Sequence, residues 1–455
     1  MLLPALSVNN MDTPICDFVR EYADSDTLRM HMPGHKGKAF LGFEQLDITE
    51  IKGADSLYEA DGIIAKSEAN ASEIFACRTL YSTEGSSQCI RAMLYLISLY
   101  AKKQGRRPLI VAARNAHKAF LTAAAMLDMD VEWLYPENPV SYLSCNLTAE
   151  ELDIFLQNAP EKPAAVYLTS PDYLGLIADI KGIAEVCHRY DVLLAVDNAH
   201  GAYLKFISES LHPIDLGADI CCDSAHKTLP VLTGGAYLHL SDLMNKAVGA
   251  QAKNALMLFG STSPSYLILQ SLDRVNPYLL DYPEVLKKQI NETENLKNSL
   301  RQQGYKLYGN EPMKLTICAK EYGYTGNELA ELLRQNKIEA EFSDPDYLVL
   351  MLSSQMNGGE LSTVERVLSE LPARDPIINE SPDFSRGKKL MSIREAMLSD
   401  SETLPVRECL GRILAVPTVG CPPAVPVLVC GEEIDEHAIR LFDYYGIDNC
   451  CVVKQ

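Results

Sequence analysis

The chain has 455 residues, too many for one ordinary hydrophobic core, and this length predicts two or three domains. A hydrophobic content of 47% and a charged content of 22% are typical of a soluble globular protein. The formal net charge of −20 argues against a nucleic-acid partner and against an anionic membrane, because both need a clustered basic surface.

No uninterrupted apolar run is long enough to span a membrane, and residues 1–10 lack the features of a signal peptide. The 13 cysteines are scattered and odd in number, which suits neither a disulfide framework nor a zinc site. We therefore expect a cytoplasmic protein whose cysteines are mostly small buried side chains. No metal ion is expected at its functional site.

Residues 1–55 are predicted to form an irregular N-terminal arm with one helix. From about residue 75, helices alternate with short apolar strands, and the helices include residues 87–102 and 183–190. The predicted strands are residues 109–113, 164–169, 192–196, 220–222 and 236–240. Short apolar strands alternating with helices indicate a mostly parallel sheet that is covered on both faces.

Polar clusters follow four of these strands, at the edge where parallel sheets bind their ligands. The clusters are residues 115–118, 170–173, 197–200 and 223–227. Because four clusters fall on one edge, the sequence predicts a single site there.

The remaining chain is predicted to contain a smaller domain and a C-terminal domain. A long charged helix over residues 282–303 leads to strands at 313–317 and 348–352, with a helix at 327–336 between them. Residues 375–389 are polar and are predicted to be a linker. The expected domains are residues 1–55 (arm), 56–280 (large), 281–375 (small) and 376–455 (C-terminal).

Lys227 is the main catalytic candidate, because it follows a strand and has hydroxyl and imidazole neighbours. A lysine that forms a Schiff base with pyridoxal phosphate (PLP) must be partly desolvated. A single lysine is more often a solvated loop residue, but Ser224 and His226 are able to donate hydrogen bonds to a phosphate. Asp197 ends another strand and offers the carboxylate that keeps a PLP ring nitrogen protonated, although an aspartate there also suits a turn cap.

Two further segments fit the same cofactor. Gly85, Ser86 and Ser87 open the helix at 87–102, where backbone amides favour an anion, although a plain serine N-cap is the common alternative. The flat imidazole of His117 suits stacking on a cofactor ring, and taken alone it is equally well a hydrogen-bonded loop residue.

Taken together, these residues resemble the Orn/Lys/Arg decarboxylase family of fold type I PLP enzymes, which have the aspartate-aminotransferase fold. The resemblance covers nearly the whole chain and is to the short bacterial branch, which lacks an N-terminal wing domain. The matching segments are MPGHKG (32–37), STEGSS (82–87), ARNAHK (113–118), TSPDYLG (169–175), VDNAHGA (196–202), DSAHKTLP (223–230), STSPSY (261–266) and CPPAVPVLVCGEE (421–433).

The resemblance implies an α/β fold: a large domain with a mostly parallel seven-stranded sheet, a small α/β domain and a C-terminal decarboxylase-type domain. It implies that Lys227 carries PLP as a Schiff base, Asp197 pairs with the ring nitrogen, His117 stacks on the ring and His200 lies near it. The phosphate would be held by Gly85, Ser86, Ser87, Ser224 and His226. Thr262 or Ser263 would reach the phosphate of a neighbouring subunit, which implies a homodimer or a higher homo-oligomer with shared active sites.

The chain departs from the family pattern at three places. Ala424 replaces the glycine of a PPGIP motif, and glycine there allows a positive φ. Gln88-Cys89-Ile90 lacks an asparagine of larger relatives, and Leu174 replaces an acid. These changes concern substrate identity more than cofactor binding.

The implied reaction is α-decarboxylation of arginine, lysine or ornithine to an amine and CO₂, as in polyamine metabolism. Lys227 or His200 would return the proton to Cα. The distal cation of the substrate needs an acidic partner, for which Glu84, Asp344 and Asp346 are candidates.

Two alternatives stay open on the sequence. One is another fold type I reaction, transamination or β-elimination, although the absence of an obvious carboxylate-clamping arginine in the small domain argues against an aminotransferase. The other is a non-catalytic homologue, against which the retention of Lys227, Asp197 and His117 argues.

Overall fold

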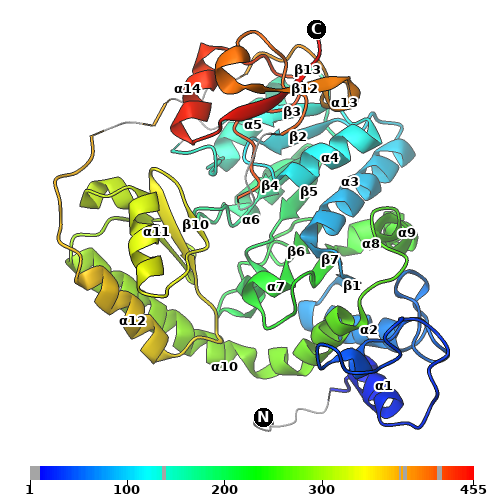
Figure 1. Ribbon diagram of the computed structural model, residues 1–455. Coiled ribbons are helices and arrows are strands. Elements are labelled where there is room, and N and C mark those ends of the chain that lie inside the picture. Colours follow the sequence, from blue (N-terminus) through cyan, green and yellow to red (C-terminus); the bar gives the residue numbers. More distant parts are fainter. Residues whose placement is uncertain (1–10, 136–139, 379–380, 383–386, 418–422) are drawn as a thin grey trace. The chain divides into compact units, whose positions relative to one another are not determined.

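The computed structural model describes residues 11–135, 140–378, 381–382, 387–417 and 423–455. Contacts divide the chain into two compact units: residues up to Tyr100 with Ala195–Lys287, and Ala101–Leu194 with Lys288–Gln455. The largest sheet has seven strands in the order β1-β7-β6-β5-β4-β2-β3 (Figure 1). The predicted fold class, α/β with a mostly parallel seven-stranded sheet, is confirmed.

The first unit contains one antiparallel strand among its sheet strands. β5 (Leu193–Asp197) pairs in parallel with β6 (Ile220–Asp223), whereas β7 (Ala236–Leu240) runs antiparallel to β6 and to β1 (Arg78–Ser82). Every residue of β5, β6 and β7 is buried. Strands covered on both faces need apolar side chains on both, which explains the continuous apolar runs in the sequence.

The helices of the first unit begin in the arm, and two of them, Gly85–Lys103 and Tyr266–Gln302, continue into the second unit. The N-terminal segment contains the predicted single α-helix, together with short 3₁₀ turns. The elements are α1 (Pro14–Ala23), η1 (Glu44–Leu46), η2 (Leu57–Glu59), α2 (Ile63–Phe75), α3 (Gly85–Lys103), η3 (Ala202–Phe206), α7 (Ala225–Thr228), α8 (Asp242–Val248), η4 (Gly249–Gln251), α9 (Ala252–Met257) and α10 (Tyr266–Gln302).

The long helix α10 begins at Tyr266, not at Tyr282 as predicted. Pro277 and Pro283 lie inside this helix, where proline removes a backbone hydrogen-bond donor. Burial outweighs that cost: Leu269, Leu272, Val275 and Leu279 recur at helical spacing and are 2% exposed or less.

The second unit contains the rest of the large sheet. β2 (Ile110–Ala113) pairs in parallel with β3 (Val131–Leu134) and with β4 (Ala165–Thr169). The helices α4 (Lys118–Leu127), α5 (Ala149–Asn158) and α6 (Ile180–Arg189) follow these strands in turn. The sequence therefore alternates strand and helix, as the predicted parallel sheet requires.

Two smaller sheets complete the second unit. The first is antiparallel in the order β10-β11-β9-β8, and α11 packs against β10 and β11 (Figure 1). The second pairs β12 with β13. The elements are β8 (Leu307–Tyr308), β9 (Lys314–Cys318), η5 (Ala319–Tyr322), α11 (Gly326–Gln335), β10 (Phe342–Ser343), β11 (Tyr347–Met351), α12 (Gly358–Ser369), α13 (Ile393–Leu398), β12 (Ser401–Pro405), η6 (Val406–Glu408), α14 (Glu436–Tyr444) and β13 (Asn449–Val453).

The predicted strands at 313–317 and 348–352 and the helix at 327–336 are present within one residue of their expected bounds. The predicted linker at 375–389 lies partly outside the described residues. Within the described ranges every cysteine is free, and no helix combines the length and apolar character needed to cross a membrane.

A buried arginine attaches the proline-rich C-terminal segment to the end of β2. Arg114 donates hydrogen bonds to the carbonyl oxygens of Pro426 (3.0 Å) and Val427 (2.9 Å), and it lies 3.8 Å from the Glu432 carboxylate. Its side chain is 3% exposed. A planar guanidinium suits this double contact, since its donors form a fixed fork.

Ala424, the residue in place of the family glycine, keeps the backbone conformation that glycine favours. Its φ is +57°, and its carbonyl accepts a hydrogen bond from the backbone amide of Lys118 at 2.8 Å. The turn is therefore retained with alanine, at the steric cost that a Cβ atom carries in the left-handed region.

Candidate active site

Lys227 and His200 form the centre of the site in the first unit. The Nζ atom of Lys227 lies 2.8 Å from Nε2 of His200. Lys227 is in the short helix α7 and half-buried, whereas His200 follows β5 and is buried. A half-buried lysine beside an imidazole has the partial desolvation that a nucleophilic amine requires.

Asp197 is the last residue of β5 and is 2% exposed. Its Oδ1 atom accepts hydrogen bonds from the backbone amide of Ala199 (3.1 Å) and from the Cys222 thiol (3.7 Å). An ionised carboxylate in a buried position needs a donor or a cation. The residue thus has the burial and the chemistry expected of a partner for a protonated ring nitrogen.

The start of α3 and the loop after β6 meet in a small polar cradle. The hydroxyl of Ser224 donates to that of Ser86 at 2.8 Å. Gly85 has a φ of +70°, and a Cβ atom built there would lie 4.0 Å from Cε1 of His226. His226 donates from Nδ1 to the carbonyl of Gly235 at 3.0 Å, and burial lowers its pKa. The structure therefore brings Gly85, Ser86, Ser224 and His226 together, as the sequence predicted.

Two buried threonines in this region lack hydrogen-bond partners among the described residues. The Oγ1 atoms of Thr83 and Thr228 are both enclosed without a partner. Thr83 precedes Gly85, and Thr228 follows Lys227. Orphaned hydroxyls are rare in protein interiors and point to a ligand. The residue set thus fits a phosphorylated cofactor. Both threonines lie inside the quoted motifs, and the sequence interpretation missed them although their hydroxyls were a visible signal.

His117, in the second unit, caps the N-terminus of α4. Its Nδ1 atom accepts a hydrogen bond from the backbone amide of Ala119 at 3.1 Å. A neutral imidazole with this acceptor carries its proton on Nε2. The ring is half-buried and follows β2, as the sequence predicted.

The remaining predicted cofactor residues lie at the surface or the helix start. Ser87 is half-buried in the first turn of α3. Thr262 and Ser263 are exposed in the loop between α9 and α10, where the Ser263 amide donates to the hydroxyl of Ser261 at 3.1 Å.

The three acids proposed for the distal substrate cation have different surroundings. Glu84 is exposed. Asp346 pairs with the ammonium of Lys320 at 2.8 Å and accepts a hydrogen bond from the Tyr444 hydroxyl at 2.6 Å. Asp344 is 6% exposed; its Oδ1 accepts two backbone amides, and its Oδ2 has no partner among the described residues.

Asp344 lines a cavity of about 340 Å³ in the second unit. Burial raises the pKa of its carboxyl to about 7. Aromatic rings form much of the wall, from Tyr142, Phe342, Tyr444 and Tyr445. Aromatic faces and a buried acid together suit an organic cation.

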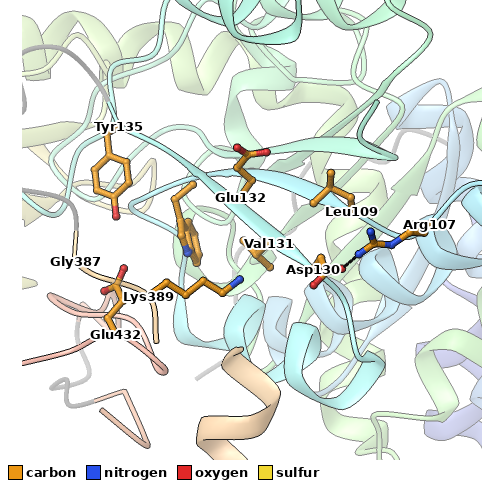
Figure 2. A pocket seen from close by; sticks show the side chains of 10 residues that line it. Arg107, Leu109, Asp130, Val131, Glu132, Tyr135, Gly387, Lys389 and Glu432 are labelled. Carbon is orange, nitrogen blue, oxygen red and sulfur yellow. Dashed lines mark hydrogen bonds and ion pairs between the residues drawn. The ribbon is translucent and has the colours of Figure 1, made fainter. Parts of the chain in front are cut away.

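Another cavity, of about 450 Å³, lies along the edge strand β3. Figure 2 shows Val131 and Glu132 of this strand with Lys389 and Glu432 from the C-terminal part of the chain. None of the predicted site residues lines this cavity. Its lining carries both charge signs, so it has no evident ligand preference.

The sequence interpretation also missed a buried group formed by His212, Asp223 and His239. Asp223 directly precedes Ser224, and Asn198 directly follows Asp197. Because neighbouring residues of a strand point to opposite faces, these adjacent polar residues were the available signal for a second group on the other face.

A mostly parallel sheet whose strand ends carry a buried aspartate, a lysine and a serine-lined helix start defines the class of aminotransferase-like enzymes. Within this class, the chain belongs to the Orn/Lys/Arg decarboxylase family. The family's major domain matches residues 13–306, and its C-terminal domain matches residues 388–448. The chain is therefore an amino-acid decarboxylase of the PLP-dependent type.

Relatives similar over most of the chain agree with this membership. An arginine decarboxylase of Halalkalibacterium halodurans is 28% identical over 459 residues, which cover 93% of this chain and 91% of that protein. An arginine decarboxylase of Bacillus subtilis is 28% identical over 470 residues, covering 94% and 92%.

Solved structures show the same fold. Lysine decarboxylase LdcF of Francisella novicida aligns with a TM-score of 0.79 at 18% identity, covering 98% of this chain and 82% of that one. A ureidoglycine–glyoxylate aminotransferase of Bacillus subtilis aligns with a TM-score of 0.54 at 16% identity, covering 67% and 83%. The lysine decarboxylase match covers a larger share of this chain than the aminotransferase match does.

Proposed function

We propose that this chain uses PLP to remove the α-carboxylate of a basic amino acid, releasing CO₂ and the corresponding amine. The contact between Lys227 Nζ and His200 Nε2 at 2.8 Å carries the proposal, because it gives a half-buried lysine a proton-accepting neighbour. Similar proteins named arginine decarboxylase and lysine decarboxylase support a basic substrate. Their names differ in the amino acid, so arginine, lysine and ornithine are all candidates.

The cofactor supplies an electron sink for the pair released when the Cα–carboxylate bond breaks. Lys227 would bind it covalently, and Asp197 would keep its ring nitrogen protonated. We assign ring stacking to His117. Gly85, Ser86, Ser87, Ser224 and His226 bind the phosphate.

Return of a proton to Cα needs a donor within hydrogen-bond reach. His200 and Lys227 are within hydrogen-bond distance of each other, so we propose that one of them is the donor. With substrate bound, the amine of Lys227 and the imidazole of His200 would together form the acid–base pair of the site.

Glu84, Asp344 and Asp346 stay the candidates for the distal substrate cation, and their surroundings differ. Lys320 already neutralises Asp346, and Glu84 is exposed to water, which screens its charge. Asp344 alone combines burial with an unpartnered oxygen.

We also propose a cytoplasmic homodimer or higher homo-oligomer. The exposure of Thr262 and Ser263 leaves both hydroxyls available to the phosphate of a second subunit. The domain boundaries at residues 55, 280 and 375 stay predictions.

The test is to incubate purified protein and PLP with arginine, lysine and ornithine separately and to identify products by mass spectrometry. An amine with CO₂ is expected from at least one of them. Keto acid or ammonia would instead indicate transamination or elimination. Lys227→Ala should lose both turnover and the visible absorbance of lysine-bound cofactor, whereas Lys246→Ala, at an exposed lysine of α8, should keep both. Absence of turnover and absorbance in the wild type would reject an enzymatic role.

A further inference from the structure

Three fully buried side chains form a cluster behind the strand ends of the first unit. The Nε2 atoms of His212 and His239 lie 3.1 Å and 3.2 Å from the same oxygen, Oδ2 of Asp223. All three side chains are 0% exposed. The cluster contains two imidazoles and one carboxylate, and none of them has a role in the chemistry described above.

The contacts of this cluster are those of a hydrogen-bonded carboxylate. The other oxygen of Asp223, Oδ1, accepts a hydrogen bond from the side-chain amide of Asn198 at 2.7 Å. His239 is oriented by the Thr79 hydroxyl, 3.0 Å from its Nδ1. Distances of 2.7–3.2 Å are typical of N–H···O bonds, so Asp223 has three donors.

These donors keep the carboxylate ionised. Burial alone would favour the neutral acid, but the neighbouring His212 and His239 lower the pKa of Asp223 below its usual value. A buried anion with several directed donors has a fixed orientation, which an apolar contact of the same size would not provide.

The cluster lies on the face of the sheet opposite to Asp197. Successive side chains of a strand point to opposite faces. Cys222 shares the face of Asp197, because its thiol donates to the Asp197 carboxylate at 3.7 Å. Asp223 follows Cys222 and therefore faces the other way, as does Asn198 after Asp197.

The bond between Asn198 and Asp223 thus ties the ends of β5 and β6 together. A second hydrogen bond, from the backbone N–H of Asn198 to the backbone carbonyl of Cys222 at 2.9 Å, joins the same two strand ends. One residue before Asn198 is Asp197, and one residue after Asp223 is Ser224. A change in this tie would displace both residues assigned to the cofactor.

We infer that Asp223, fixed by His212 and His239 and bonded to Asn198, is a positioning residue that sets the separation of Asp197 and Ser224 for cofactor binding. This inference rests on the proposed function. The carboxylate acts through the strand ends and touches neither substrate nor cofactor.

The test compares Asp223→Asn with Asp273→Asn in the full-length protein loaded with PLP. Asp273 is also a buried carboxylate of the first unit, but it accepts hydrogen bonds from the backbone amides of Ile15 and Cys16 in α1. The readouts are the dissociation constant of PLP, the pH titration of the absorbance of lysine-bound cofactor, kcat and KM.

For Asp223→Asn we expect PLP affinity to fall about tenfold or more and the titration midpoint to move, with kcat lowered and KM nearly unchanged. Asp273→Asn should lose stability but keep the affinity and the titration. If Asp223→Asn does not fold, Asn198→Ala removes only the tie and should give smaller changes in the same direction.

Equal loss of stability in Asp223→Asn and Asp273→Asn, with PLP affinity and titration unchanged in both, would overturn the inference. So would one equivalent of a metal ion in the purified wild type that Asp223→Asn lacks, because the three side chains would then be ligands. If the wild type itself forms no lysine-bound cofactor, the proposed function is wrong, and the inference, which rests on it, is wrong as well.

Discussion

The Nζ atom of Lys227 and the Nε2 atom of His200 lie 2.8 Å apart, which is hydrogen-bond distance. One nitrogen must donate and the other must accept. Lys227 lies in the short helix α7 after β6, and His200 lies in the loop after the adjacent parallel strand β5. The parallel pairing of those strands therefore brings the lysine to the histidine.

His200→Ala should lower kcat by about a hundredfold or more, because a positioned acid–base group contributes factors of that size. Lys227 remains in this variant, so the visible absorbance of lysine-bound cofactor should persist. Steady-state kinetics and absorbance spectra measure the two effects. His188→Ala, at an exposed histidine of α6, should change neither. Unchanged turnover in His200→Ala would remove His200 from the chemistry.

Arg114→Lys should lower the free energy of unfolding by about 2–4 kcal/mol, since lysine cannot bond two carbonyl oxygens in the same fork. Those carbonyls, of Pro426 and Val427, would be left buried with fewer donors. Chemical denaturation measures the change. Arg107→Lys is the matched control. Arg107 is exposed and pairs with Asp130 in Figure 2, so its replacement should cost about 1 kcal/mol or less. Equal losses would contradict the role of Arg114.

Ala424→Gly should stabilise the protein or leave it unchanged. Relief of a left-handed alanine contributes about 1–2 kcal/mol, and loss of one buried methyl group offsets about 0.8 kcal/mol. Ala123→Gly, in α4, also removes a buried methyl but has a right-handed backbone, so it should destabilise by about 1 kcal/mol or more. Denaturation midpoints compare the two. A clear loss of stability in Ala424→Gly would show that its φ carries no strain.

The apolar runs predicted the buried strands to within one or two residues, because most side chains of a strand covered on both faces are apolar. β1 and β3 were not predicted. β3 has exposed and half-buried positions at Glu132 and Trp133, and β1 begins at the half-buried Arg78. Their pairing depends on partners that are distant in sequence, and local patterns do not encode those partners.

The residues around Lys227 could be named from sequence because they follow strands in quoted motifs. The contacts between these residues could not be predicted from the sequence. The bond between Ser224 and Ser86 joins positions 138 residues apart, and the His212–Asp223–His239 cluster needs three separate segments to meet. Such contacts depend on tertiary packing, which a single sequence reveals only through family resemblance.

Asp344 should make stability fall as pH rises between about 4 and 7. Burial raises its pKa to about 7 in the folded chain, against about 3.9 when unfolded. Between these values the folded state holds the extra proton, so the free energy of unfolding decreases with pH and levels off above about 7.

Asp344→Asn cannot ionise, so it should lack this decrease. At pH 5 its stability should exceed that of the wild type by about 1.5 kcal/mol, and at pH 8 it should be higher by up to about 4 kcal/mol. Urea denaturation of both proteins from pH 5 to pH 8 measures the difference. Parallel pH profiles would show that Asp344 ionises normally. If Asp344 binds the distal cation, the same variant should raise KM for the basic substrate at pH 8, where the wild-type carboxylate is charged.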